Sequence, residues 1–173
     1  KKVGVTPAKL AEYWSVSWWE PRHTAKLKRV AEGNVDLIMV GDSITQGWEE
    51  EAGAKVWQEY YGKRNAVNLG FSGDRTENVL WRLKNGEIDG ISPKVAVVMI
   101  GTNNTGHRLH QPEYTAEGVR QIVELLKTKL ENTKILLLAV FPREAQADAQ
   151  MRLINEEINA KISTLADGNR VHF

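Results

Sequence analysis

Three short polar segments hold the residues of this chain that could carry out chemistry: Gly41–Thr45, Gly70–Arg75 and Gly101–Asn104. The first offers the hydroxyl of Ser43 as a nucleophile. The second offers backbone amides that glycines leave open to a bound group, and the third offers carboxamides that donate hydrogen bonds as backbone N–H groups do. Together they could attack an ester carbonyl and stabilise the resulting alkoxide. Taken singly, they could equally be a helix cap, a glycine turn and an Asx turn.

Each polar segment follows an apolar run that predicts a buried strand. The runs are Val35–Val40, Val67–Leu69 and Val95–Ile100, with a fourth at Ile135–Phe141. They are nearly continuous rather than alternating, which is typical of parallel strands whose two faces are both covered. Ligands bind beyond the carboxyl ends of the strands in open α/β sheets, so we expect the three polar segments to converge there.

Helical patterns separate these runs and predict an α/β fold in a single domain. Apolar residues recur at three- and four-residue spacing, as they do from Val119 to Leu130. No repeat or Pro/Gly-rich linker divides the chain, and a last strand begins within 170–173. The predicted helices are Pro21–Ala31, Lys55–Tyr61, Thr76–Leu83, Tyr114–Leu130 and Gln146–Leu165.

Composition narrows the possible chemistry. The 173 residues carry a net charge of +1, which gives no electrostatic footprint for nucleic acid, and we expect no nucleic-acid partner. The chain has no cysteine, so it can form neither a disulfide nor a thiolate metal site. No apolar run approaches the ~20 residues of a membrane span. We expect neither a metal nor a cofactor.

The order of Ser43, Gly73 and Asn103, each in a turn that closes a strand, resembles the GDSL or SGNH hydrolase family, named for its Ser, Gly, Asn and His. The resemblance runs from about residue 36 to residue 142. Within the family the chain is similar to the catalytic subunits of platelet-activating-factor acetylhydrolase and their bacterial relatives. That likeness is carried by Gly73–Glu87 and by Pro93-Lys94-Val95 ahead of the third turn.

The resemblance implies a three-layer α/β/α, flavodoxin-like sandwich with a parallel sheet. It implies an esterase in which Ser43 is the nucleophile and the Ser43 amide, the Gly73 amide and the Asn103 side chain form the oxyanion hole. The implied substrates are short-chain esters, acetyl above all, of a small lipid, a sugar or a glycan. Because the resembling subunits associate as dimers, a homodimer is a further expectation.

Two further residues are expected on the substrate side of the site. Asp42 is interpreted as the hydrogen-bonding organiser of the first turn, and Trp48 as an aromatic wall of the pocket because it lies close to Ser43 in sequence. The segment Tyr13–His23 holds three of the six tryptophans. These could stack on a sugar or line an acyl pocket, but large aromatics mostly bury, which favours a hydrophobic brace.

A serine nucleophile needs a general base, and the family supplies one as an Asp-x-x-His pair near its C-terminus. None of the four histidines here has an aspartate three positions before it. We therefore expect a single domain over residues 1–173 that is truncated at its C-terminus and lacks this pair. The first residue is Lys1 rather than a methionine, so the sequence leaves the cellular compartment open.

Three alternatives stay open. The chain could be a non-catalytic ligand-binding module, or an inactive fragment, that keeps the crevice without the base. His107 or His110 could replace the missing base, although neither has an evident orienting carboxylate. A flavin-binding protein shares the layered architecture, but the first turn lacks the Ser/Thr-rich phosphate cradle expected of one.

Overall fold

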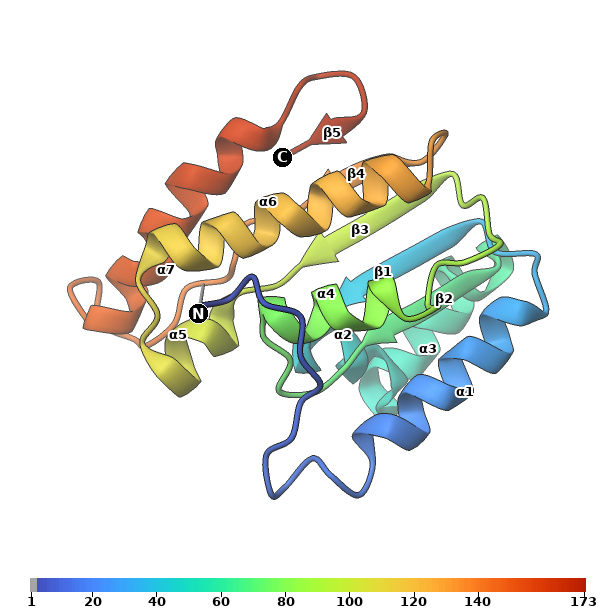
Figure 1. Ribbon diagram of the computed structural model, residues 1–173, viewed down its shortest axis with the longest axis horizontal. Helices are drawn as coiled ribbons and strands as arrows, with labels where there is room; N and C mark the ends of the chain where they lie inside the picture. The colour runs from blue at the N-terminus through green and yellow to red at the C-terminus, as the bar shows by residue number, and fades with distance from the viewer. Residues whose placement is uncertain (1–2) are drawn as a thin grey trace.

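A computed structural model describes residues 3–173 of the chain. Five parallel strands form one sheet in the order β2-β1-β3-β4-β5, which confirms the predicted α/β class (Figure 1). The strands are β1 (Leu37–Gly41), β2 (Ala66–Gly70), β3 (Val95–Met99), β4 (Lys134–Leu137) and β5 (Val171–His172).

Helices connect the strands as the sequence predicts. No helix within residues 3–173 is long and apolar enough to cross a bilayer. The α-helices are α1 (Trp19–Ala31), α2 (Ser43–Gln46), α3 (Glu51–Tyr60), α4 (Thr76–Lys84), α5 (Thr102–Arg108), α6 (Pro112–Lys129) and α7 (Gln150–Ile162), and the 3-10 helices are η1 (Gly47–Glu49), η2 (Gly62–Arg64) and η3 (Ser163–Leu165).

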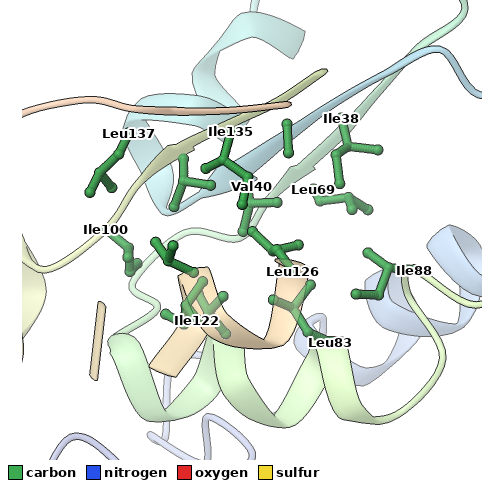
Figure 2. Packing of buried hydrophobic residues seen from close by; sticks show 14 of the residues in the cluster. Ile38, Val40, Leu69, Leu83, Ile88, Ile100, Ile122, Leu126, Ile135 and Leu137 are labelled. Carbon is green, nitrogen blue, oxygen red and sulfur yellow. The ribbon is translucent and has the colours of Figure 1, made fainter. Parts of the chain in front are cut away.

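The main core lies between the sheet and one outer layer of helices. Helices α4, α6 and α7 cover this face, and α1 lies beside them near β2 (Figure 1). Figure 2 shows Ile122 and Leu126 of α6 packed under Val40 and Ile135 of the sheet. All four side chains are fully buried, so this interface contributes directly to the apolar burial that stabilises the domain.

The opposite face of the sheet carries α2, η1 and α3 as the third layer (Figure 1). Within residues 3–173 this layer is incomplete. A groove of about 850 Å³ runs over β1, β3 and β4, and Leu136 and Phe141 on its floor are 40% and 51% exposed. The continuous apolar strands predict cover on both faces, and here the second face is covered only in part.

Strand β4 ends four residues earlier than the apolar run Ile135–Phe141 predicts. Asn159 of α7 takes over the backbone groups of Val140: its Oδ1 accepts from the Val140 N–H at 2.7 Å and its Nδ2 donates to the Val140 carbonyl at 2.8 Å. A side-chain amide thus replaces the neighbouring strand as hydrogen-bond partner. Helix α7 also begins later than predicted, at Gln150, and the carboxylate of Glu144 accepts from the N–H of Met151 in its first turn.

Two helices at the ends of strands are missing from the sequence-based prediction. Helix α2 has only four residues, too few to show a period. Helix α5 is built from two threonines, two asparagines and Gly106 in its seven residues, and these types disfavour helix interiors. Both helices follow directly from strand ends, so the segments predicted as turns are helix N-termini.

The packing in Figure 2 predicts a large loss of stability when α6 is trimmed. Leu126→Ala should lower the free energy of unfolding by about 2–5 kcal/mol, because it removes buried methyl groups and leaves a cavity. The matched control is Leu153→Ala on α7, where the side chain is 48% exposed and the loss should stay below about 0.5 kcal/mol. Urea unfolding followed by circular dichroism measures both. Equal losses in the two variants would contradict this description of the core.

Candidate active site

The register of the sheet brings the three polar segments to one edge. Gly41 at the end of β1 pairs with Gly70 of β2 on one side and with Met99 of β3 on the other. A Cβ atom at Gly70 would lie 2.4 Å from the backbone nitrogen of Gln46, so only glycine lets α2 pack this closely on β2. The Oε1 atom of Gln46 accepts the N–H of Ser72 at 2.7 Å, which joins the first two segments.

The first segment presents Ser43 at the start of α2. Asp42 is the N-cap of this helix, and its Oδ1 accepts from the Ile44 N–H at 3.0 Å. The alternative in which Ser43 caps the helix is therefore wrong. Ser43 is exposed, and within residues 3–173 its hydroxyl and its backbone N–H have no hydrogen-bond partner. The serine is free to meet a ligand.

The second segment turns at Gly73, whose φ is +81°. This left-handed conformation favours glycine. The Gly73 N–H has no acceptor among residues 3–173, although the residue is buried. A buried N–H without a partner is costly, so this amide is suited to a group that arrives with a ligand.

The third segment supplies Asn103, which is 8% exposed. Its Nδ2 donates one hydrogen to the carbonyl of Asp74 at 3.0 Å, and the second amide hydrogen stays available. Its neighbour Asn104 is fully buried and bonds Thr76 twice, through Oδ1 to the backbone N–H at 3.0 Å and through Nδ2 to Oγ1 at 2.9 Å. Of the two carboxamides, Asn104 is structural and Asn103 is the candidate donor.

Asp42 lies beneath the site rather than at its surface. The residue is 1% exposed, and burial raises the pKa of its carboxyl to about 6. The Ile44 N–H and the positive charge of Arg143 favour the ionised form and limit this shift. This placement fits an organiser of the turn.

The four histidines all have partners away from Ser43. His23 contacts Glu87 at 2.5 Å in the interior, and His172 contacts the carbonyl of Asn169 at 3.1 Å. Nδ1 of His107 lies 3.1 Å from Nη1 of Arg75, and burial with the nearby arginines lowers the pKa of its ring.

His110 contacts Asn104 at 3.3 Å, and burial lowers the pKa of its ring as well. Among residues 3–173 no histidine contacts Ser43. That part of the chain also holds no group of three or more His, Cys, Asp or Glu side chains able to bind a metal ion.

Aromatic residues surround the site in two different ways. Trp48 in η1 is half-buried, lines the groove beside Ile44 and packs edge-on against Tyr61. Trp19 is fully buried, with Leu10 and Phe71 forming the second, smaller core cluster, so the predicted hydrophobic brace is confirmed for this residue.

Trp14 differs from the other N-terminal tryptophans. A Cβ at Gly73 would lie 2.2 Å from its Cη2, so its ring covers the second turn. The ring also contacts His107 edge-on, with 5.8 Å between the ring centroids. About a third of Trp14 is exposed, so it forms a rim of the site.

Comparison with known proteins shows which protein family this chain belongs to. The profile of the GDSL-like lipase/acylhydrolase family matches residues 39–173. The chain belongs to this family. It is 32% identical over 156 residues to human platelet-activating factor acetylhydrolase IB subunit alpha1, covering 90% of this chain and 64% of that protein.

It is 36% identical over 141 residues to the human alpha2 subunit, covering 82% of this chain and 58% of that protein. The chain thus spans about three fifths of the length of these curated relatives. An acetylxylan esterase from Geobacillus stearothermophilus, solved as a catalytic mutant, has the same fold. Its TM-score is 0.61 at 20% identity, over 80% of this chain and 74% of that one.

The candidate site depends on one group that the sequence does not predict. The backbone carbonyl of Asp74 orients the Asn103 side chain, and Asp74 itself is fully buried. Asp74 follows Gly73 directly in a predicted turn, where an aspartate usually faces solvent. No local pattern signals that its carboxylate points inward.

The buried carboxyl of Asp42 predicts a pH-dependent stability. The pKa of this carboxyl is about 6 in the fold and 3.8 in the unfolded chain, so the folded state binds the proton more tightly, and the free energy of unfolding falls as the pH rises from about 4 to 6. Asp42→Asn keeps an N-cap acceptor and removes this titration. Above pH ~6 the variant should be more stable than the parent by up to about 3 kcal/mol, and near pH ~4 the two should converge.

Unfolding by urea at several pH values measures this difference. Asp148→Asn, at an exposed position, is the control and should follow the parent at every pH. A constant gap between Asp42→Asn and the parent across the range would show that Asp42 does not titrate in the fold as described.

Proposed function

We propose that this chain carries the nucleophile and oxyanion hole of a serine esterase that hydrolyses short-chain esters through an acyl-enzyme intermediate. The observation that carries the proposal is the exposed, unpartnered Ser43 at the first position of α2, on the same sheet edge as the free N–H of Gly73 and the Asn103 amide. Membership of the GDSL-like lipase/acylhydrolase family supports the same reaction class.

In the proposed reaction the Ser43 Oγ attacks the carbonyl carbon of the ester and loses its proton to a general base. The carbonyl oxygen becomes an oxyanion, which accepts hydrogen bonds from the amides of Ser43 and Gly73 and from Nδ2 of Asn103. Collapse of the intermediate expels the alcohol, which takes up the proton, and leaves the acyl group on Ser43. Water then attacks this ester by the same route and releases the acid.

We assign the general base to none of the residues 3–173, because no histidine among them contacts Ser43. We propose that the Asp-x-x-His pair of the family has no counterpart in residues 1–173. Activity of the chain as given then depends on a base supplied from outside it. A small diffusible base such as imidazole can take that role in a test.

Acetyl esters are the proposed substrates, with a lipid, a sugar or a glycan as the alcohol. The curated relatives are named acetylhydrolases and a structural neighbour is an acetylxylan esterase, which supports an acetyl group. Trp48 is proposed as a wall of the substrate site. A homodimer is a further part of the proposal, and sedimentation velocity measures it directly.

A second candidate function is that of a ligand-binding module that has the crevice and performs no turnover. The observation that favours it is the absence, within residues 3–173, of a histidine that contacts Ser43. The two functions differ in whether Ser43 becomes acylated.

Ser43→Ala separates the two functions. We expect the parent chain to hydrolyse p-nitrophenyl acetate faster in the presence of imidazole than the Ser43→Ala variant does, because the external base takes the Ser43 proton. Intact mass spectrometry of the parent, quenched during turnover, should show one acetyl group that the variant lacks. Since imidazole itself attacks the ester, the variant supplies the background rate. Equal rates and no acetylated protein would support the binding module instead.

Asn103→Ala tests the oxyanion hole. Loss of one preorganised donor should lower the Ser43-dependent rate on the order of 10²–10³-fold and leave the substrate concentration at half-maximal rate unchanged. Asn132→Ala, at an exposed position, is the control and should keep the parent rate. An Asn103→Ala variant as fast as the control would remove Asn103 from the proposed oxyanion hole.

A further inference from the structure

A fully buried guanidinium lies below the site. Arg82 on α4 is 0% exposed, and all its donating nitrogens have acceptors: Nε donates to Asp74 Oδ2 at 2.7 Å, Nη1 to Glu87 Oε1 at 2.5 Å and Nη2 to the carbonyl of Gly41 at 3.3 Å. Its flat face lies 3.9 Å from the centre of the Phe71 ring. Burying a charge is costly unless it is paired, and here two carboxylates pair it.

The partners of Arg82 belong to the segments that form the site. Gly41 ends the strand that leads into Asp42 and Ser43. Asp74 follows Gly73, and its backbone carbonyl accepts the Asn103 amide at 3.0 Å. One side chain therefore contacts the first and second segments directly and reaches the third through a single intervening residue.

Asp74 is fixed at every polar atom. Its Oδ1 accepts from Trp19 Nε1 at 2.6 Å, its Oδ2 from Arg82, and its backbone N–H donates to the Phe71 carbonyl at 3.1 Å. Gly73 just before it has the torsional freedom of a glycine. The residues on both sides of Gly73 are held, Ser72 through its N–H bond to Gln46 and Asp74 through its own contacts, and Arg82 supplies the charged part of the hold on Asp74.

We propose that Arg82 is the positioning residue of the oxyanion hole, acting through Asp74 to orient the Gly73 N–H and the Asn103 amide and through the Gly41 carbonyl to hold the Ser43 turn. The inference rests on the proposed function for its effect on rate, but the positions of the donors can be measured without turnover. Stabilisation of an oxyanion depends on donors that are aligned before the reaction, so small displacements lower the rate.

Arg82→Lys is the decisive variant. Lysine keeps the positive charge, but its single ammonium cannot match the planar fork that reaches Asp74, Glu87 and Gly41 in three directions. Arg170→Lys is the matched control. Arg170 also uses its guanidinium to hold backbone carbonyls, those of Lys127, Leu130 and Thr133, and these lie away from the site.

A second variant guards against a failure of Arg82→Lys to fold. Burial raises the pKa of Asp74 to about 7, although Arg82 and Trp19 favour its charged form, so removing this charge costs less than removing that of an aspartate with an ordinary pKa. Asp74→Asn keeps the size of the side chain and an acceptor for Trp19, and it places an amide N–H₂ where Arg82 needs an acceptor. It should fold and disturb the same donors.

The first measurement is by NMR on protein with isotope-labelled glycine and asparagine. In Arg82→Lys and Asp74→Asn the signals of the Gly73 N–H and the Asn103 amide should shift or broaden, while those of Gly33 and Gly168, in distant turns, stay in place. Arg170→Lys should leave the Gly73 and Asn103 signals unchanged. If both site variants also leave them unchanged, Arg82 does not position these donors and the inference is overturned.

The second measurement is the imidazole-supported hydrolysis of p-nitrophenyl acetate, corrected for the folded fraction. Arg82→Lys should lower the maximal Ser43-dependent rate on the order of 10²-fold without changing KM, and Arg170→Lys should keep the parent rate. A purely structural role would instead lower Tm and leave the rate of the folded fraction unchanged, which overturns the inference. The donor signals could shift in Arg82→Lys and Asp74→Asn while the parent chain shows no Ser43-dependent turnover. That result would uphold the positioning role and overturn the proposed esterase.

Discussion

The parallel register of β1, β2 and β3 is the constraint on which the site depends. Because Gly41 pairs with both Gly70 and Met99, the three strands end at one level and their polar segments meet there. A slip of one residue would move every core side chain of a strand to the opposite face, so the core that sets the register also sets the site. Burial of Val40, Leu69 and Val98 thus determines where Ser43 lies.

Beneath this edge the interior changes from apolar to charged. Arg82, Asp74 and Glu87 are each fully buried, and together they tie α4 to β1 and to the segment after β2. Charges removed from water interact strongly, and they hold the backbone more firmly than apolar contacts, which have no preferred direction. The core fixes the level of the strand ends, and the charged layer fixes the directions of the groups that project from them.

The sequence predicts the features that a local pattern can express. Apolar runs predict β1 to β4, and residue types and order predict Ser43, Gly73 and Asn103 as residues of the site. What it does not predict depends on contacts between distant positions: Asn159 ends β4 by binding Val140, and Asp74 turns inward to meet Arg82. The short helices α2 and α5 both follow strand ends, and Asp42 caps α2; they form although their residue types give little helical signal.

The partly uncovered face of the sheet also shapes how stability varies with temperature. Apolar groups contribute to the heat capacity of unfolding only when unfolding newly exposes them to water. Side chains such as Leu136 and Phe141, along the 850 Å³ groove, are already hydrated in the folded chain. We therefore expect a smaller heat capacity change of unfolding for residues 3–173, relative to their number, than for a sandwich covered on both faces, and a free energy of unfolding that curves less strongly with temperature.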